Sequence, residues 1–344
     1  MPINIHDVAR EAGVSVSTAS RVIREAGYVS QTTRSRVQIA IEKLQYRPNM
    51  TARQLKYGRT FSIGFVMGDI SNPFFGLAVK GAEQFIRSNG GQEYELILFN
   101  TNGESHSEIK AIETMVNKRV EGIIIASTAS DECLELLRKV QDEYHIPIVS
   151  IDNELGVGEV GIVTAGNTLG SYELVSHLVN VHHHSRIGLI SGPAQESHAC
   201  ERLEGCLQVF RQAALPIEDD LIQSGKWSYE DGYQITQDWI KKDILPTAIY
   251  CSNNLMGMGA ISALRENNLR VPQDVAVVSF DDMQFGHLLT PRLTHLDYAW
   301  DKIGEETAKL LLEGINAQTE AVNPVHIKLP VTLVIRDSCG CNCM

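Results

Sequence analysis

The chain has 344 residues, of which 43% are hydrophobic, 21% charged and 6% aromatic, and at about 150 residues per domain this predicts two or three folded domains. It lacks a run of about 18 apolar residues and a signal-peptide start, and its seven cysteines are an odd number, so we expect a cytoplasmic protein without membrane-spanning helices or a disulfide framework. The charge is uneven: residues 1–60 hold ten basic and four acidic residues, or +6, which leaves 20 and 38, or −18, for residues 61–344. A basic head on an acidic body favours a polyanionic partner for the head, although ordinary variation in surface charge is the alternative.

The first 47 residues contain three predicted short helices. Asn4 and Asp7 have the spacing of a capping box, and Gly13 lies where a left-handed residue ends a helix. Ser15 and Ser30 precede two further runs whose apolar residues are spaced three and four apart. The predicted helices cover residues 5–12, 16–23 and 31–45. Two short helices joined around a glycine and braced by a third are typical of a helix-turn-helix, which binds DNA.

The second helix of such a head enters the major groove, and its exposed face carries Val16, Ser17, Ser20 and Arg21. Arg21 has two donors for a guanine edge, Val16 suits a thymine methyl group, and Ser17 suits a base or a phosphate. The alternative is a three-helix bundle whose arginine and serine side chains only face water.

The segment 46–60 is short, basic and too small to bury a face of its own. Pro48 suits the first turn of a helix, and such a short helix needs a partner in order to form. Leu55 lies between Arg53 and Lys56 and has the character of an apolar wedge beside phosphate-binding cations. The alternative is a solvated linker at the charge boundary.

From Phe61 onward, apolar runs typical of buried strands alternate with amphipathic helical segments. The predicted strands are 63–67, 96–99, 122–126, 146–151, 186–190, 248–251 and 275–280. The predicted helices are 74–88, 105–117, 131–143, 169–181, 201–213, 229–240 and 255–266. The alternation predicts an α/β fold with two doubly wound parallel-sheet lobes, since there are too many units for one small sheet.

Polar and aromatic residues follow these strands, at the edge where ligands of doubly wound sheets bind. They are residues 69–75, Ser127, Thr128, Asp152, Asn153, Trp227, residues 252–254, Asp281 and Asp282. Carboxylates and amides bind sugar hydroxyl groups, and aromatic rings pack on the apolar face of a sugar, so this edge suits a sugar ligand. The alternative for each Asp or Asn is a helix N-cap, which suits Asn254 and Asp282.

Two other motifs are typical of proteins with different functions. Residues 156–161 match the dinucleotide pattern G-x-G-x-x-G, but residues 162–164 after it predict a strand where a pyrophosphate needs the start of a helix. A metal site is suggested by the histidines at 182–184 and by the C-x-C-x-C pattern of cysteines at 339–343. Adjacent histidines point in different directions and the tail lacks the spacing of zinc sites, so we expect no metal and no cofactor. No catalytic grouping is evident, and we expect no enzyme.

Runs of residues in the head match one known family in order and spacing. They are DVAREAGVS at 7–15, TASRVI at 18–23, YRPN at 46–49 and ARQL at 52–55. In these runs the head resembles the lactose/galactose-repressor (LacI/GalR) family of bacterial transcriptional regulators. The resemblance implies a hinge helix at 48–57 that forms only on DNA. The implied DNA contacts are Val16, Ser17 and Arg21 to bases, Ser15, Ser20, Asn49 and Arg53 to phosphates, and Ala52 and Leu55 in the minor groove.

The body resembles the same family over nearly its whole length, in runs such as NPFF at 72–75, VPQDV at 271–275 and PRLT at 291–294. The implied fold is that of periplasmic binding proteins, in which two lobes close on a small molecule. The implied effector contacts are Phe74, Phe75, Ser127, Asp152, Arg202, Trp227, Asn253 and Asp281. Asn254 stands where the family usually has Asp, and residues 182–185 depart from the usual Gly-His-Arg-Arg.

These interpretations divide the chain into a head, a hinge and a body. We expect the helix-turn-helix head at 1–47, the hinge helix or linker at 48–60 and the two-lobed body at 61–344. The expected lobes are 61–160 with about 293–320, and 161–292 with about 321–338.

The sequence therefore predicts a DNA-binding transcriptional regulator, a repressor of a carbohydrate operon, whose operator affinity is set by a sugar or sugar acid. We expect a homodimer on a near-palindromic operator, since the chain lacks the leucine-heptad tail of the family's tetramers. The alternatives are a nucleobase or nucleoside effector, or a cytoplasmic sugar-binding protein without DNA. An oxidoreductase is opposed by the strand that follows residues 156–161.

Overall fold

The computed structural model describes residues 3–23, 27–46, 58–89, 94–283, 285–317 and 324–341. The chain divides into two compact units, Met1–Thr60 and Phe61–Met344, which we call the head and the body. No helix within the described ranges is long and apolar enough to cross a membrane.

The described part of the head is a bundle of three helices, α1 (Ile5–Ala12), α2 (Val16–Ile23) and α3 (Gln31–Leu44). Asn4 and Asp7 form the predicted capping box on α1, and Gly13 ends that helix at a φ of 62°. The guanidinium of Arg36 in α3 donates to the carbonyls of Ala12 (2.5 Å) and Gly13 (3.0 Å), so α3 holds the turn between α1 and α2. The buried apolar core consists of Val8, Ala9, Ala12, Ala19, Val22, Val37 and Ala40. The predicted arrangement of two short helices and a brace is confirmed.

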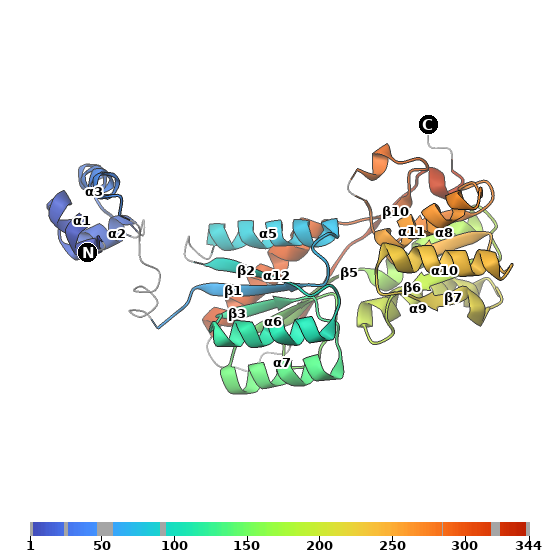
Figure 1. Ribbon diagram of the computed structural model, residues 1–344, viewed down its shortest axis with the longest axis horizontal. Helices are drawn as coiled ribbons and strands as arrows, with labels where there is room; N and C mark the ends of the chain where they lie inside the picture. Colours follow the sequence, from blue (N-terminus) through green and yellow to red (C-terminus); the bar gives the residue numbers. More distant parts are fainter. Residues whose placement is uncertain are drawn as a thin grey trace. The chain divides into compact units, whose positions relative to one another are not determined.

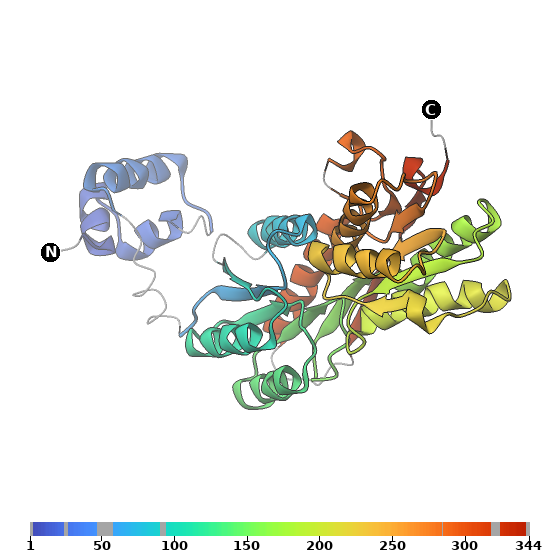
Figure 2. The ribbon, with the colours of Figure 1, turned by 45° about the vertical axis from the view of Figure 1, so that its right-hand side comes forward.

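The body consists of two lobes, and each lobe is built on one sheet (Figures 1 and 2). The strands of the first lobe are β1 (Ser62–Met67), β2 (Glu95–Asn100), β3 (Gly122–Ile125), β4 (Ile148–Ile151), β5 (Gly161–Ala165) and β11 (Val325–Leu329). Those of the second lobe are β6 (Ile187–Ser191), β7 (Ile222–Ser224), β8 (Ala248–Cys251), β9 (Ala276–Ser279), β10 (Thr294–Asp297) and β12 (Thr332–Val334). The sheet orders are β11-β5-β4-β3-β1-β2 and β12-β10-β9-β8-β6-β7. The pairs are parallel except β10 with β12, which confirms the predicted α/β class.

Helices cover both faces of each sheet. They are α5 (Pro73–Asn89), α6 (Ser105–Asn117), α7 (Asp131–Tyr144) and α12 (Trp300–Ala317) in the first lobe, and α8 (Asn167–Asn180), α9 (Ser197–Gln212), α10 (Tyr229–Lys241) and α11 (Asn254–Glu266) in the second. They pack in pairs, α5 with α12, α6 with α7, α8 with α9 and α10 with α11. One apolar cluster continues from the α5 and α12 side of the first lobe to the α8 and α9 side of the second, while α6 with α7 and α10 with α11 cover clusters of their own. The inner strands β1, β3, β4, β5, β6, β8 and β9 are therefore buried on both faces, as their near-continuous apolar sequences indicate, whereas the edge strands β2, β7, β11 and β12 are partly exposed.

The lobe boundaries differ from the expected ones at three strands. The chain passes to the second lobe after β5, returns after β10 and passes again after β11. We expected β5 and β11 in the second lobe and β10 in the first. Instead β5 pairs with β4 and β11, and β10 pairs with β9. The residues of a strand carry no signal for the sheet it joins, because its partners are far away in sequence.

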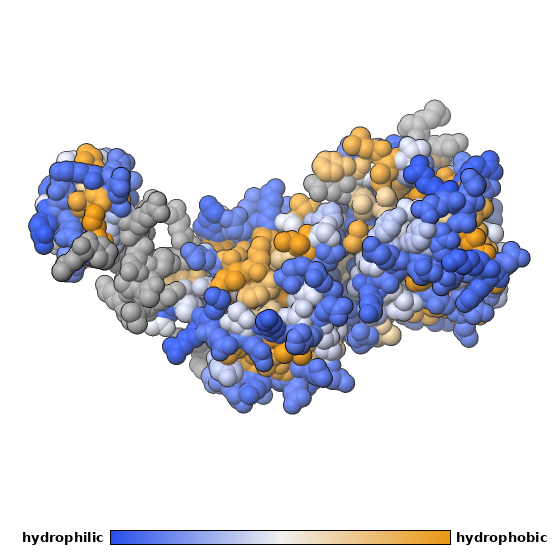
Figure 3. Space-filling view, viewed as in Figure 1, coloured by the Kyte–Doolittle hydropathy of each residue, from blue (hydrophilic) through white to orange (hydrophobic). Residues whose placement is uncertain are grey.

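Hydrophobic side chains gather on one face of the body (Figure 3). On the first lobe they lie over α5 and β2, the elements that carry the exposed Leu77 and Leu98. On the second lobe they lie around the short helix η2 (Gly286–Leu288), where Leu288 is 72% exposed. Apolar patches of this kind on folded proteins mark interaction sites.

Candidate functional site

A cavity of about 240 Å³ is lined by residues of both lobes. The lining residues follow the carboxyl ends of strands, among them β1, β3 and β4 in the first lobe and β8 and β9 in the second. The structure brings all eight implied effector contacts into this lining: Phe74, Phe75, Ser127, Asp152, Arg202, Trp227, Asn253 and Asp281. Ligands of doubly wound sheets bind at this edge, so the cavity is the candidate effector site.

Arg202 is the buried cation of the cavity, with 3% of its surface exposed. It lies in α9, where its Nε donates to Oδ1 of Asn167 (2.8 Å) and its Nη1 to the carbonyl of Ser252 (2.5 Å). Its Nη1 is 3.6 Å from Oδ2 of Asp281, and its Cζ is 3.7 Å from the ring centroid of Phe280. These contacts hold the guanidinium in one orientation at the cavity wall.

Asp281, which follows β9, is the partner of that cation. It is buried, and its Oδ1 accepts a hydrogen bond from the hydroxyl of Tyr298 at 2.8 Å. Burial raises the pKa of Asp281 above its ordinary value, although Arg202 opposes the rise. Arg202 and Asp281 therefore form a buried ion pair in which each charge depends on the other.

Asp152 supplies a second carboxyl group at the end of β4. Its backbone has a φ of 66°, a left-handed conformation that Asp tolerates better than most residues. Its Oδ1 accepts from the hydroxyl of Thr164 at 3.2 Å. Burial raises the pKa of Asp152 to about 6, with Arg202 opposing the rise. This carboxyl group therefore titrates close to physiological pH.

Trp227 and His198 form a stacked pair, with ring centroids 4.8 Å apart and planes at 14°. The Nε1 of Trp227 donates to Oε2 of Glu196 at 2.8 Å, and the same oxygen is 3.5 Å from Nε2 of His198. Burial raises the pKa of Glu196 to about 7. Burial, assisted by Arg202, lowers the pKa of His198 well below its usual range, so the imidazole is neutral at pH 7. Our sequence analysis missed both Glu196 and His198.

Asn153 orients this imidazole. Its Nδ2 donates to the carbonyl of Ser127 (2.7 Å), which turns its Oδ1 toward Nδ1 of His198 (2.9 Å). We therefore assign the proton of His198 to Nδ1, which leaves Nε2 as an acceptor for a protonated Glu196. The hydroxyl of Ser127 donates to the buried carboxyl group of Glu108, so this donor is already used within the protein.

Asn253 is the N-cap of α11 as well as a lining residue. Its Oδ1 accepts from the backbone N–H of Met256 (2.9 Å), and its Nδ2 donates to the carbonyl of Trp227 (2.8 Å). The N-cap role that we considered for Asn254 is therefore wrong. Asn254 is buried, and its Nδ2 donates to the carbonyl of Asp282 at 2.7 Å.

The lining combines carboxyl groups with aromatic rings. Phe74 and Phe75 at the start of α5 meet edge to face, with centroids 5.0 Å apart. The carboxyl groups of Asp152, Glu196 and Asp281 share the lining with the guanidinium of Arg202. Carboxyl oxygens accept hydrogen bonds from hydroxyl or N–H groups, and rings pack on a flat apolar face. The cavity thus suits a small neutral molecule that has several donors.

The head places the predicted base-reading residues on or beside α2. Ser17 and Arg21 are exposed. Val16 is half-buried against the apolar core of the head, so its side chain is less accessible to a DNA base than we expected. Ser15 is exposed but its Oγ also accepts from a backbone N–H of α2 at 3.1 Å, and Ser20 is half-buried. Asn49, Ala52, Arg53 and Leu55 lie outside the described residues.

Two family models match the chain. Residues 4–49 match "Bacterial regulatory proteins, lacI family", and residues 60–336 match "Periplasmic binding proteins and sugar binding domain of LacI family". The chain belongs to the LacI family. Members of this family are DNA-binding transcriptional regulators and not enzymes, so the predicted fold and regulator class are confirmed.

Individual relatives cover almost the whole of this LacI-family chain. It is 32% identical over 335 residues to the HTH-type transcriptional repressor PurR of Pasteurella multocida (strain Pm70), covering 97% of this chain and 98% of the relative. It is 32% identical over 314 residues to the ribose operon repressor of Escherichia coli (strain K12), covering 91% and 93%. A crystal structure of the lac repressor dimer bound to operator and the anti-inducer ONPF aligns with a TM-score of 0.82 at 27% identity, covering 98% of this chain and 99% of that one.

The glycine motif at 156–161 forms a loop whose backbone N–H groups bind the carboxylate of Glu159, a residue of the same loop. Glu159 accepts hydrogen bonds from the backbone N–H groups of Leu155 (3.0 Å), Gly156 (3.0 Å) and Val157 (2.8 Å). Burial acts to raise the pKa of Glu159, but these bonds outweigh it and the pKa is lowered. Gly161 opens β5 and not a helix, as the sequence indicates.

The histidine and cysteine motifs meet in a way that we did not predict. The side chains of His177, His182, Cys339 and Cys341 form one group of metal-ligating residues. His183 and His184 do not belong to it. Our expectation of no metal site rested on the divergence of adjacent histidines, but the second imidazole comes from α8. Cys343 lies outside the described residues.

Proposed function

We propose that this protein is a repressor that binds operator DNA as a homodimer and whose DNA affinity is set by a neutral, hydroxyl-rich effector held in the cavity. Because the proposed partner is bacterial chromosomal DNA, we place the protein in the cytoplasm. The observation that carries the effector class is the excess of carboxyl groups over cations in the lining, where Asp69, Asp152, Glu196 and Asp281 accompany Arg202 and Lys226. An anionic ligand such as a sugar phosphate or sugar acid meets unfavourable charge there, which narrows the class suggested by the sequence to neutral sugars.

The similarity to the ribose operon repressor supports a sugar, and the similarity to lac repressor bound to operator supports control through the head. The dimer is supported by the apolar face over α5, β2 and η2 (Figure 3), elements that carry the exposed Leu77, Leu98 and Leu288. A second copy of the chain would cover this face.

A nucleobase or nucleoside effector is the second candidate. The stacked rings of Trp227 and His198 offer a flat surface, and carboxyl groups also accept hydrogen bonds from ring N–H groups. The guanidinium of Arg202 suits a ring carbonyl. The two candidate effectors would therefore occupy the same site. They differ in whether hydroxyl groups or ring N–H groups donate to the carboxyl groups.

A ligand screen followed by DNA binding tests the proposal. We expect pentoses or hexoses, and not nucleobases, nucleosides or sugar phosphates, to raise the melting temperature of the full-length protein, since a ligand that binds only the folded state stabilises it. The same ligand should change the affinity for DNA from upstream of the gene. In its absence the logarithm of the affinity should fall steeply with the logarithm of the salt concentration. A protein that ignores this DNA at low salt, with and without each ligand, contradicts the proposal, and stabilisation by a nucleobase alone selects the second candidate.

A further inference from the structure

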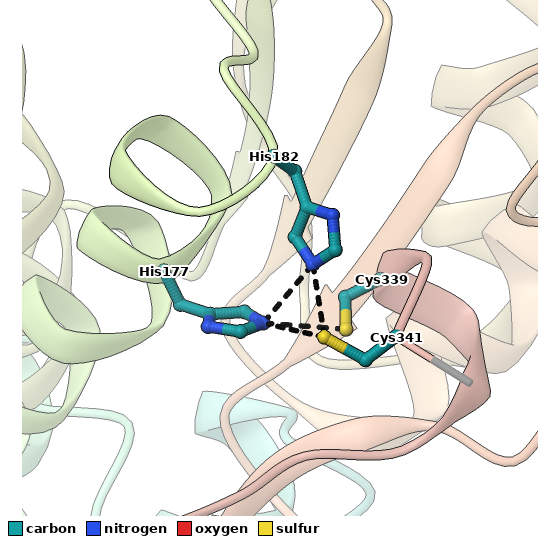
Figure 4. A group of neighbouring side chains, drawn as sticks. All are labelled: His177, His182, Cys339 and Cys341. Atoms are coloured by element: carbon teal, nitrogen blue, oxygen red, sulfur yellow. Dashed lines mark hydrogen bonds between the residues drawn. The ribbon is translucent and has the colours of Figure 1, made fainter. Parts of the chain in front are cut away.

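Four metal-ligating side chains meet in the second lobe, apart from the cavity (Figure 4). They are His177 in α8, His182 just after α8, Cys339 in the short helix η3 (Asp337–Cys339) and Cys341. Their four ligating atoms all lie within 4.8 Å of one another. Nothing in the proposed DNA and effector chemistry uses this group.

Four distances between ligating atoms in this group have the size of the edges of a tetrahedral coordination shell. Nε2 of His182 is 3.3 Å from Nε2 of His177 and 3.2 Å from Sγ of Cys341, and Nε2 of His177 is 3.4 Å from Sγ of Cys339 and 3.6 Å from Sγ of Cys341. Zinc bonds of about 2.0 Å to nitrogen and 2.3 Å to sulfur give edges of about 3.3 Å between two nitrogens and about 3.5 Å between nitrogen and sulfur in a tetrahedron. These four distances match those edges, and the two other pairs of ligating atoms lie within 4.8 Å, so the side chains surround a point that a zinc ion can occupy. In Figure 4 the two imidazoles and the two thiols converge on that point from separate segments.

The two cysteines are positioned by contacts of the tail that do not involve the histidines. The guanidinium of Arg292 donates to both carboxyl oxygens of Asp337, at 2.7 and 2.8 Å. The buried Ser338 donates to the carbonyl of Val277 (2.5 Å) and accepts from the backbone N–H of Thr294 (2.8 Å). The tail is thus fixed to β9 and β10 just before Cys339.

Gly340 then makes the turn that brings the second cysteine back to the same point. Its φ is 106°, a conformation that side-chain-bearing residues rarely adopt, and a Cβ atom there would lie 3.2 Å from Nδ1 of His182. A glycine between Cys339 and Cys341 lets both sulfurs face the histidines.

We propose that His177, His182, Cys339 and Cys341 bind one zinc-type divalent ion, which fastens the C-terminal segment to α8. Two thiolates and two imidazoles are a ligand set that zinc prefers, and four protein ligands leave no open position for substrate, so the ion is structural. The ion joins segments about 160 residues apart in the chain, because the cysteines follow the last strand and the histidines lie at the end of α8. Such a link stabilises the folded second lobe.

The experiment uses the reduced full-length protein without a histidine tag. After incubation with Zn²⁺ and dialysis, we expect one zinc ion per chain by elemental analysis. Co²⁺ should give the visible absorption bands of a tetrahedral site together with a thiolate charge-transfer band. Removal of the metal with a chelator should lower the melting temperature by about 5 °C or more, since ligand binding to the folded state is lost.

Matched variants separate this site from adventitious binding. Cys341→Ser and His182→Ala, which change half-buried residues, should weaken metal binding at least tenfold and change the cobalt spectrum. His183→Asn, whose backbone φ of 58° Asn tolerates, and Cys200→Ser, at an exposed thiol, should leave both unchanged. Metal binding that survives Cys341→Ser and His182→Ala unaltered overturns the proposal. A reduced protein that binds no metal, or that forms only a disulfide between Cys339 and Cys341, also overturns it.

Discussion

We expect Arg202 to contribute to ligand binding and to folding through the same contacts. Its charge is removed from water and is balanced by Asp281, so the loss of either partner leaves a buried charge without compensation. Its spacing of four residues from His198 also places both side chains on one face of α9. That spacing is the signal in the sequence that could have led us to His198.

We predict that Arg202→Ala or Asp281→Ala abolishes the response to effector while the head still binds DNA. Each change should also lower the free energy of unfolding by about 3 kcal/mol, because it breaks a buried ion pair. Isothermal calorimetry with the effector and denaturant unfolding measure the two effects. Arg211→Ala removes an exposed ion pair with Glu204 on the same helix and should cost below about 1 kcal/mol with the effector response intact. Unchanged effector affinity in both cavity variants contradicts the site assignment.

Glu196 makes the stability of the body depend on pH. Its pKa is raised by burial to about 7, so the folded protein holds a proton that the unfolded chain has lost between about pH 4.5 and 7. Stability therefore falls as the pH rises through this range.

We predict that Glu196→Gln removes much of this dependence. The amide oxygen can still accept from Trp227, but the group no longer ionises. Relative to the variant, the wild-type protein should lose up to about 3 kcal/mol of unfolding free energy between pH 5 and pH 8. Denaturant unfolding at several pH values measures the difference. Parallel curves for the two proteins show that Glu196 is not the titrating group.

At the scale of elements, the head depends on the turn between α1 and α2. Gly13 has a left-handed backbone, and a Cβ atom there would lie 2.6 Å from Nη2 of Arg36, the group that holds this turn. We predict that Gly13→Ala lowers the stability of the head by about 1 kcal/mol or more and weakens operator binding. Calorimetric melting should show the change in the head transition with the body transition unchanged. An unaltered head transition would show that the turn relaxes freely.

The hinge segment remains a proposal based on the sequence, since Leu55 lies outside the described residues. We predict that Leu55→Ala weakens operator binding at least tenfold, because the apolar wedge that kinks the minor groove is lost. Gel-shift titration measures operator affinity, and effector calorimetry should be unchanged as the control. Equal operator affinity rules out the wedge.

For the whole molecule, the proposed homodimer rests on the apolar face that spans both lobes. We predict that Leu77→Glu combined with Leu98→Glu yields monomers, because charges introduced on a buried interface are left without partners. Sedimentation analysis measures the state, and operator affinity should fall because two half-sites are no longer bound together. The exposed Val181, on the second lobe, provides a control as Val181→Glu and should leave the dimer intact. Dimers that persist in the double variant place the interface elsewhere.

The sequence by itself determined the elements that depend on neighbouring residues. The capping box at Asn4 and Asp7, the left-handed Gly13 and the alternation of apolar strands with helices are local patterns, and the structure contains each of them. The family motifs also singled out eight residues that all line the cavity, several of which follow parallel strands and therefore share one edge of a sheet.

The tertiary structure alone decided which sheet β5, β10 and β11 join, because strand pairing links residues far apart in the chain. It also placed Glu196 and His198 at the cavity. The pKa values of these two residues are shifted by burial, which cannot be read from the neighbouring sequence. The meeting of His177 and His182 with Cys339 and Cys341 has the same origin. Their ligating atoms come together only when the folded tail returns to the end of α8, since chain folding, and not sequence spacing, sets the distance between remote residues.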